Sequence, residues 1–301
     1  MSKRSGQSGI LLVDKPQGIT SHDVVARVRK AADTRRVGHA GTLDPMATGL
    51  LVLGLNSSTR LLTYFVGLDK EYFATIRLGA ATNTDDADGE VVFRGEISTS
   101  SIADAALEAE IGKLTGEISQ VPSSVSAIKV DGKRAYTLVR EGETVELKPR
   151  AVTISAFEVL SRDGDDLAVR VECSSGTYIR ALARDLGAAL GTGGHLTALR
   201  RTRIGPFHIA DAIELDSDSL VGLVEASLLN PVDAASLLFE TVTLDDEQAR
   251  DLAQGKRPHL EAPDGSPVAA VTGDGRLAGL VSITGGVAKP LINFPTDEVL
   301  G

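Results

Sequence analysis

The sequence predicts an α+β protein, with a mixed central sheet flanked by helices and a small β-rich module at its C-terminal end. Short apolar or alternating runs of strand length recur between residues 10 and 173, and amphipathic helical patterns lie between some of them. The stretch after about residue 240 consists of short β-rich runs separated by glycine turns. A hydrophobic content of 42% and a charged content of 24% are typical of a globular chain with a sizeable core.

The elements predicted for the first part of the chain begin with an apolar strand. In order they are the strand 10–13 with a turn over 14–18, a helix capped by Thr20 or Ser21, the strand 50–55, the strand 72–78 and an amphipathic helix over 101–114. The helix after residue 20 has an apolar face of three valines at 24, 25 and 28. In the strand 72–78, Tyr72, Ala74 and Ile76 share one face because side chains alternate along a strand.

The second part of the chain continues with strands over 152–160 and 167–173. Thr177 is positioned to cap a helix that runs to about Leu190 and ends at Gly191. Residues 211–240 are acidic and helical in pattern, with a break at Asn230-Pro231. In the β-rich region that follows, Asp274-Gly275 is typical of a hairpin turn.

These patterns predict a flexible tail over residues 1–9, a first domain over 10–238 and a second domain over 239–301. The N-terminal tail has no apolar core like that of a signal peptide, and no apolar run approaches the roughly 18 residues that a membrane span needs. With one cysteine, Cys173, the chain can form no internal disulfide. We therefore expect a cytoplasmic protein that does not enter membranes.

The charge of the chain is unevenly distributed. The formal net charge is −10, yet residues 1–60 contain nine Lys/Arg against four Asp/Glu, and residues 122–205 contain thirteen against ten. Binding to nucleic acid depends on local basic surface more than on the net charge of the whole protein. These two regions could therefore contact phosphates, although uneven charge along a chain is also common without any such role.

Several kinds of active site find no support in the sequence. The five histidines lack the spacing of zinc ligands, and neither a Walker A motif nor a G-x-S-x-G nucleophile elbow is present. A carboxylate that works without a metal remains the best candidate. The segment GHAGTLDPMATGLL, residues 38–51, contains one acid, Asp44, directly before Pro45. Proline disfavours helical geometry at the preceding residue, so Asp44 is expected in an extended loop.

A partner for Asp44 is available in the segment SSGTYIRALARDLG, residues 174–187. Arg180 lies in the first turn of the helix predicted there, and a guanidinium can form a bidentate pair with a carboxylate. Such a pair would hold Asp44 ionised. The alternative is an exposed arginine that makes an ordinary surface pair.

The chain resembles the bacterial tRNA pseudouridine synthase B (TruB) family in several segments that follow one another in order. These are LLVDKPQGITSHDVV at 11–25, GHAGTLDPMATGLL at 38–51, KEYFATIRLG at 70–79, TNTDDADGEV at 82–91, QVPSSVSAIKVDGKRAY at 120–136, SSGTYIRALARDLG at 174–187 and GGHLTALRRTRIG at 193–205. The resemblance covers about residues 10–205. The C-terminal module resembles a PUA-type RNA-binding domain more weakly.

This resemblance implies a mainly antiparallel pseudouridine synthase fold with an RNA-clamping insertion at about 122–150. The implied reaction converts uridine 55 in the T-loop of tRNA to pseudouridine, without a metal, a redox cofactor or a guide RNA. The implied partner is tRNA, bound through its T-arm and elbow, with the PUA-like module towards the acceptor stem. No obligate protein partner is expected.

The resemblance also assigns roles to individual residues. Asp44, Tyr72 and Arg180 would be catalytic, with Tyr72 stacking on the flipped uracil and its hydroxyl relaying a proton. The residues expected to bind substrate are His39, Lys15, Tyr178, Leu199, Asp86, Arg200 and Arg201. Among these, His39 would stack on displaced nucleotides, Lys15 would support the pocket or touch phosphate, and Asp86 would orient the loop beside the site.

Plainer roles remain open for most of these residues. Tyr72 and Leu199 could be core residues, His39 could make a turn hydrogen bond, and Lys15 could be solvated. The run Arg200, Arg201 and Arg203 would contact phosphates, or else form a solvated strand end. Gly41 and Gly49 would let the loop approach RNA closely.

Two other functions remain alternatives to a synthase. A tRNA-folding chaperone would bind and open the tRNA elbow, with modification secondary. An N-glycosidase would break the same bond but release free uracil, whereas a synthase keeps the base attached.

Overall fold

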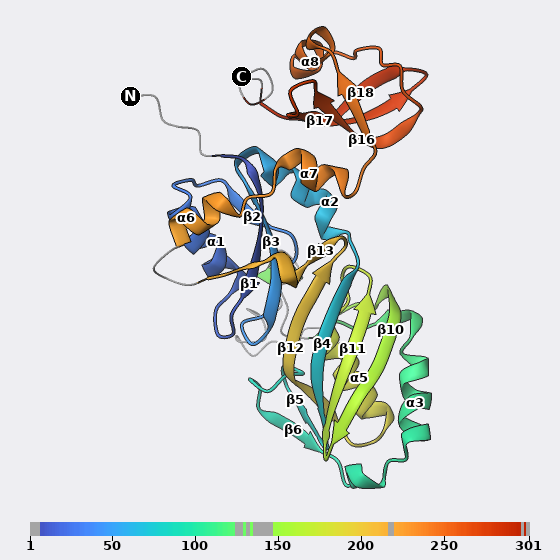
Figure 1. Cartoon of the computed structure of the whole chain (residues 1–301). Coiled ribbons are helices and arrows are strands. Elements are labelled where there is room, and N and C mark those ends of the chain that lie inside the picture. Colours follow the sequence, from blue (N-terminus) through green and yellow to red (C-terminus); the bar gives the residue numbers. More distant parts are fainter. Residues whose placement is uncertain are drawn as a thin grey trace.

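The computed structural model describes residues 7–123, 129–130, 133–134, 147–215, 220–295 and 298. Most of the insertion expected at about 122–150 lies outside these described residues. β1 (Gly9–Lys15) begins inside the expected N-terminal tail. Figure 1 shows a large body built on a long sheet, with a smaller β-rich module at the C-terminal end of the chain.

The central sheet has the strand order β14-β1-β3-β12-β4-β11-β10-β7, with β2 beside β3 and β13 beside β12. Its other strands are β2 (Val37–His39), β3 (Thr48–Leu55), β4 (Lys70–Leu78), β7 (Gly116–Gln120), β10 (Arg150–Asp163), β11 (Asp166–Cys173), β12 (Gly194–Ile204), β13 (Phe207–His208) and β14 (Ile213–Glu214). Within this described sheet, only the pairs β1–β14 and β3–β12 are parallel. The expected mixed, mainly antiparallel sheet is therefore confirmed.

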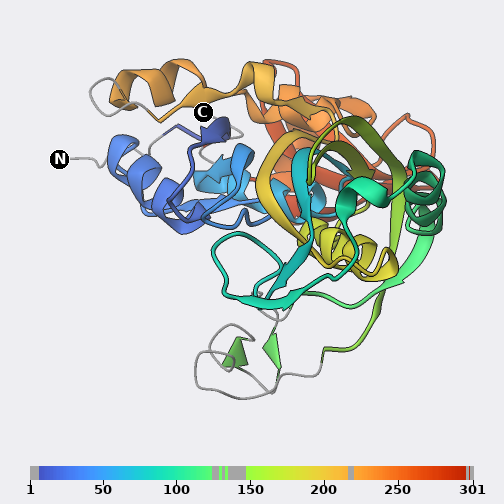
Figure 2. The same cartoon turned by 90° about the horizontal axis from the view of Figure 1, so that it is seen from below.

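Helices flank this sheet, and two small hairpins form separate two-stranded sheets. The helices are α1 (Ser21–Ala31), α2 (Leu62–Val66), α3 (Asp104–Lys113), α5 (Ile179–Ala189), α6 (Leu220–Ala226) and α7 (Pro231–Ser236). The hairpins are β5 (Ala80–Thr82) with β6 (Val91–Arg94), and β8 (Lys129–Val130) with β9 (Lys133–Arg134). The β8–β9 pair stands apart from the central sheet when the molecule is seen from below (Figure 2).

The N-terminus of α1 agrees with the cap predicted from the sequence. Thr20 accepts a hydrogen bond from the backbone of Asp23, and the Asp23 carboxylate accepts one from the backbone of Thr20. This is a capping box, which satisfies free N–H groups at the start of a helix. At α5 the expectation was wrong, because Tyr178 is the N-cap and the Thr177 hydroxyl donates to the carbonyl of Ser174 instead.

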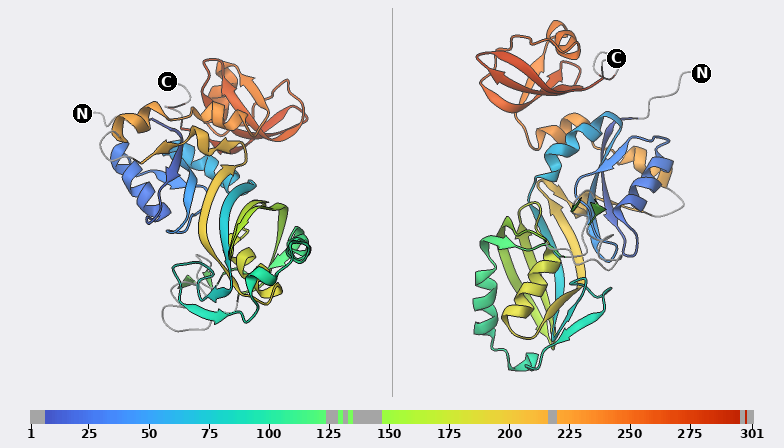
Figure 3. Two further views of the ribbon diagram at one scale, coloured as in Figure 1. Left: turned by 60° about the horizontal axis from the view of Figure 1, so that its bottom comes forward. Right: turned by 180° about the vertical axis from the view of Figure 1, so that it is seen from behind.

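Buried and more exposed side chains alternate along β4 because one face of the sheet packs on the hydrophobic core. Tyr72, Ala74, Ile76 and Leu78 are buried on the face that meets α5, with Leu182 and Leu186 of the helix in the same cluster. Seen from behind, α5 crosses this face of the sheet (right view of Figure 3). The apolar face of β4 therefore places Tyr72 beneath the N-terminal part of α5.

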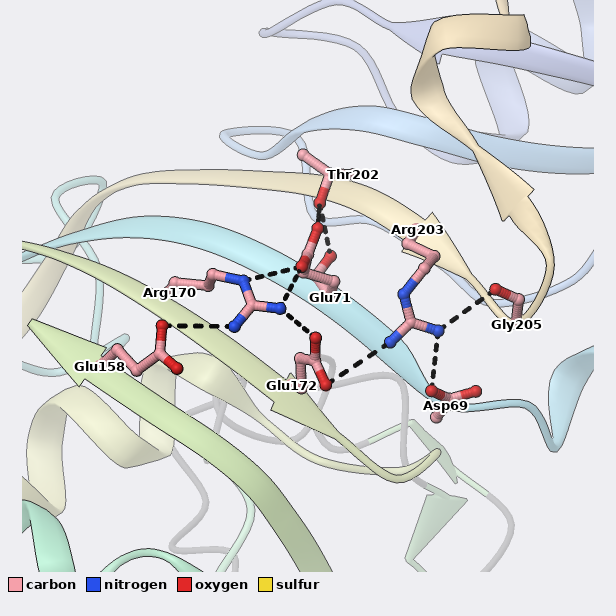
Figure 4. Close-up of polar contacts among 8 residues, drawn as sticks. All are labelled: Asp69, Glu71, Glu158, Arg170, Glu172, Thr202, Arg203 and Gly205. Carbon is pink, nitrogen blue, oxygen red and sulfur yellow. Dashed lines mark hydrogen bonds and ion pairs between the residues drawn. The ribbon is translucent and has the colours of Figure 1, made fainter. Parts of the chain in front are cut away.

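The opposite face of the sheet carries a ladder of charged side chains (Figure 4). Arg170 on β11 donates to Glu71 at 2.8 Å and to Glu158 at 3.3 Å, and it also bonds Glu172. Burial alone would raise the pKa of Glu71, but hydrogen bonds from Thr202 and Arg170 outweigh it and lower that pKa. The ladder joins β10, β11, β4 and β12 directly behind the strand segments that carry Tyr72 and Arg201.

The C-terminal module is a four-stranded sheet with the order β15-β16-β17-β18. Its elements are β15 (Thr241–Leu244), α8 (Asp246–Ala253), β16 (Gly265–Thr272), β17 (Leu277–Thr284) and β18 (Val287–Asn293). The Asp274-Gly275 turn joins β16 to β17, as the sequence predicts. Ala234 and Ala235 of α7 belong to one apolar cluster with residues of this module and of β1. The division into domains at residues 238 and 239 stays a prediction.

Candidate active site

A pocket of about 280 Å³ lies between the Asp44 loop, the start of β4, the N-terminal end of α5 and β12. Of the residues expected at the site, it is lined by Asp44, Tyr72, Tyr178, Arg180, Leu199 and Arg201. These residues come from four segments far apart in the sequence. His39, Lys15, Asp86 and Arg200 do not line it.

The loop around Asp44 is fixed by hydrogen bonds on both sides of the carboxylate. The Ser21 hydroxyl donates to the carbonyl of Leu43 at 3.0 Å and accepts from the N–H of Leu43 at 2.8 Å. The N–H of Gly18 donates to the carbonyl of Pro45 at 2.8 Å. The Asp44 side chain remains 38% exposed, so its carboxylate is held in place and still open to a ligand.

Arg180 links Asp44 to a second acid. Its Nε lies 3.0 Å from Oδ2 of Asp44, and its Nη1 lies 3.5 Å from Oδ2 of Asp86. Nη1 also donates to the carbonyl of Thr84 at 2.8 Å. The Arg180 side chain is only 4% exposed, so the expected pair with Asp44 is present and is a buried one. Asp86 lies behind Arg180, where it can orient the guanidinium and does not face the pocket.

Arg201 is a buried member of the basic run that the sequence shows at residues 200–203. Its side chain is buried with 1% exposure, its Nε donates to the carbonyl of Leu50 at 2.8 Å and its Nη2 to that of Gly41 at 3.0 Å. This buried guanidinium joins β12 to the two ends of the Asp44 loop and lines the pocket. The phosphate contact expected for Arg201 stays a prediction.

Lys15 is likewise an internal support. It has 0% exposure, and its Nζ donates to the carbonyls of Pro16, Ile19 and, at 3.4 Å, Pro45. Neither a solvated lysine nor one that touches phosphate fits this burial. Of the roles considered from the sequence, support of the pocket is the one that agrees with the structure.

The burial of Lys15 predicts a specific pH dependence. Burial lowers the pKa of Lys15 to about 8, although nearby Asp44 acts in the opposite direction. Between this value and the ordinary value of 10.5, the unfolded chain binds more protons than the folded one, so stability gained through Lys15 rises with pH. We expect the difference in unfolding free energy, wild type minus Lys15→Met, to increase by roughly 1–3 kcal/mol from pH 8 to pH 10. Urea denaturation at several pH values measures it, and a flat difference would contradict the assignment.

Position 49 requires a glycine for a different reason from the one expected. A Cβ at this position would lie 2.2 Å from the carbonyl oxygen of Arg201 and 2.7 Å from its nitrogen, and φ is +104°. The close approach is therefore to the backbone of β12, where Gly49 pairs with Arg201, and the approach to RNA expected of this loop stays a prediction.

Gly49→Ala should therefore destabilise the protein more than a matched glycine substitution. Gly18 has φ +87°, but a Cβ at this position would have no neighbour within 4 Å, so Gly18→Ala isolates the backbone strain of about 1–2 kcal/mol. Gly49→Ala adds the clash with β12, and we expect it to lose about 1–3 kcal/mol more. Thermal or urea unfolding of both variants measures the difference, and equal losses would show that the contact with Arg201 is unimportant.

Three more of the expected residues line the pocket, namely Tyr72, Tyr178 and Leu199. Tyr72 and Leu199 are each 8% exposed and sit on neighbouring strands. Burial raises the pKa of Tyr72, while the positive charge of the nearby Arg201 acts in the opposite direction. The phenol therefore stays protonated near neutral pH and can donate a proton. Both core and pocket roles apply, because these side chains are largely buried and also line the cavity.

His39 and Arg200 lie outside the pocket. His39 ends β2 opposite Leu53 and is half-buried, and burial together with Arg201 lowers its pKa. Arg200 lies between Leu199 and Arg201 on β12, so alternation turns it to the other face, where it pairs with Asp14 at 2.6 Å. The RNA contacts expected of both residues stay predictions.

Lys70 is a pocket residue that was not among those expected from the sequence. It lines the pocket, is buried, and donates to the carbonyl of Val66 at 2.7 Å and to that of Leu68. Burial lowers its pKa to about 8. It precedes Tyr72 by two positions in one strand, so alternation alone could have placed both side chains on one face.

Among the described residues there is neither a cluster of metal ligands nor a helix that could span a membrane. No group of three or more His, Cys, Asp or Glu side chains there is arranged to hold a metal ion. Every described helix is too short or too polar to span a membrane.

Comparison with known families matches almost the whole chain. Residues 29–179 match the TruB family pseudouridylate synthase (N terminal domain), residues 180–235 the tRNA pseudouridylate synthase B C-terminal domain, and residues 239–295 the tRNA Pseudouridine synthase II, C terminal. A tRNA pseudouridine synthase B of Leifsonia xyli subsp. xyli is 60% identical over 300 residues, which cover 97% of this chain and 98% of that protein. One of Arthrobacter sp. (strain FB24) is 53% identical over 309 residues, covering 98% and 99%.

Solved structures resemble the fold at lower identity. A chain of a Cbf5-Nop10-Gar1 complex is 26% identical with a TM-score of 0.70, covering 97% of this chain and 86% of that one. A chain of an H/ACA RNP bound to a substrate RNA containing 2'-deoxyuridine has a TM-score of 0.71 at 24% identity, with the same coverage. The second similarity speaks for the fold alone.

Proposed function

This chain belongs to the TruB family of pseudouridylate synthases and is an isomerase that forms pseudouridine in tRNA, and from this premise we propose that its target is uridine 55 in the T-loop. We further propose that it needs neither a guide RNA nor a protein partner. The observation that carries the proposal is the Asp44 carboxylate. It is partly exposed in a pocket that also presents Tyr72, and it is paired at 3.0 Å with a buried Arg180.

The reaction requires the target nucleotide to leave the base stack. A flipped uracil would enter the pocket between Tyr72, Tyr178 and Leu199. Stacking on an aromatic ring stabilises a base by about 1–3 kcal/mol, which offsets part of the few kcal/mol that flipping costs. The rigid strands β4 and β12 would hold two of these side chains in a fixed orientation.

The chemistry breaks one bond to C1′ of the ribose and forms another. The N1–C1′ bond breaks, the uracil turns, C5 bonds to C1′, N1 gains a proton and C5 loses one. The Asp44 carboxylate suits two routes, covalent attack on the sugar or proton abstraction that leads to a glycal. In either route Arg180, 3.0 Å from the carboxylate, would hold it in one orientation. The Tyr72 hydroxyl is placed to relay a proton.

We propose that the rest of the tRNA lies outside this pocket. The T-arm and elbow would contact the catalytic body, where His39 would stack on displaced nucleotides and Arg200 would approach phosphate. The C-terminal sheet would extend the contact towards the acceptor stem. The cytoplasm, where tRNA is modified, is the expected location.

The test is tritium release from a T-arm hairpin that carries 5-tritiated uridine at position 55, with the purified protein and no other RNA or protein. Isomerisation must expel the hydrogen at C5, so we expect stoichiometric release. A hairpin with 5-tritiated uridine only at another loop position is the control. Release only after a guide RNA or partner is added would contradict the proposal, and free uracil would indicate a glycosidase.

A further inference from the structure

Gln120 makes an unusual pair of hydrogen bonds with a pocket residue. Its Nε2 donates to the carbonyl of Tyr178 at 3.1 Å, and its Oε1 accepts from the N–H of Tyr178 at 2.9 Å. Gln120 is the last residue of β7 and is 2% exposed. One buried side chain thus satisfies both backbone polar groups of a residue 58 positions away.

Tyr178 depends on this contact because of its place in the fold. It is the N-cap of α5, with extended backbone at φ −105° and ψ 106°, and no side chain caps the helix there. Its ring lines the pocket, and Arg180 follows two residues later. A shift of the Tyr178 backbone would therefore move the ring relative to a bound base.

A second tether holds the same junction. Arg184 of α5 donates through Nη2 to the carbonyl of Val121 at 2.7 Å and through Nη1 to Asp85 at 3.2 Å. Asp85 precedes Asp86, which pairs with Arg180. The end of β7, the loop before Asp86 and the first turns of α5 are therefore joined, and Gln120 is the member that acts on Tyr178.

We propose that Gln120 is a positioning residue that sets where the Tyr178 ring lies in the pocket. The proposal rests on the proposed function, because its consequence is read in isomerisation. The amide of Gln120 presents a donor and an acceptor on two separate atoms, which match the carbonyl and the N–H of Tyr178. An ionised glutamate at this position accepts from the N–H but repels the carbonyl, and an alanine removes both hydrogen bonds.

The test compares Gln120→Ala and Gln120→Glu with wild type in the tritium-release assay. Misplacement of a group by about 1 Å can reduce turnover about 100-fold, so we expect kcat to fall at least tenfold while KM changes less than threefold. Gln248→Ala is the matched control, since Gln248 also accepts from one backbone N–H (Asp245, 3.0 Å) and donates to one carbonyl (His259, 3.0 Å), in the C-terminal module. It should change kcat less than twofold. An unchanged kcat in Gln120→Ala would overturn the proposal.

A double-mutant cycle shows whether Gln120 acts through Tyr178. If it does, Gln120→Ala lowers kcat much less in a Tyr178→Ala background than in wild type. Independent, multiplicative losses would overturn the proposal, because they would indicate a general structural role.

A readout that needs no activity separates this inference from the proposed function. With 3-fluorotyrosine in place of the four tyrosines, ¹⁹F NMR should show the Tyr178 signal shifted or broadened in Gln120→Ala and unchanged in Gln248→Ala. The Tyr178 signal is assigned by its absence in Tyr178→Phe. An unmoved signal overturns the positioning role. If wild type proves inactive on the hairpin, the proposed function fails, and this spectrum still decides whether Gln120 positions Tyr178.

Discussion

Asp44→Asn should abolish tritium release while leaving the protein folded and able to bind RNA. An amide can neither attack the sugar nor accept the proton, so we expect the rate to fall at least about 1,000-fold. The fold should survive, because Arg180 keeps its contacts with Asp86 and Thr84 and the loop keeps its bonds through Leu43 and Pro45.

The measurement pairs this variant with Asp166→Asn as control. Asp166 pairs with Arg77 on the exposed part of the sheet, away from the pocket lining, and its substitution should leave the rate within about twofold. Tritium release by Asp44→Asn at a rate near wild type would remove Asp44 from the chemistry. If wild type releases no tritium but Asp44→Asn and wild type both accelerate tRNA folding, the chaperone is the better description.

Arg180→Met should cause the largest combined loss of stability and activity. It leaves Asp86 buried without the cation that faces it, and removing one partner of a buried ion pair costs about 3–5 kcal/mol. It also releases Asp44 from its 3.0 Å contact, so we expect the rate to fall at least about 100-fold. Arg77→Met is the control, because its pair with Asp166 is exposed and should contribute less than about 1 kcal/mol.

The double variant Arg180→Met with Asp86→Asn separates the two effects. Removing both charges avoids an isolated buried carboxylate, so urea denaturation should show that much of the lost stability returns. Tritium release should stay low, because Asp44 still lacks its partner. Recovery of activity together with stability would show that Arg180 acts only on the fold.

Local patterns predicted the elements well where neighbouring residues alone decide the structure. The capping box at Thr20, the alternation from Tyr72 to Leu78 and the turn at Asp274-Gly275 each depend on groups a few residues apart. Thr177 is not the cap: its hydroxyl donates to the carbonyl of Ser174, and the extended N-cap is Tyr178, whose N–H and carbonyl both bond to Gln120 of a distant strand. A sequence window cannot contain such a distant partner.

The site shows the same division between local and distant causes. Residue types and their order were enough to name residues that could carry the chemistry, since the motif around Asp44 and the arginine at position 180 can be read from the chain. The folded arrangement was needed to show that Arg201 and Lys15 are internal supports, that Gly49 accommodates the backbone of β12, and that Asp86 completes the contacts of Arg180. The physical reason is that charge and residue type are written in the chain, whereas burial and the partner that satisfies a buried group are set by segments that meet only on folding.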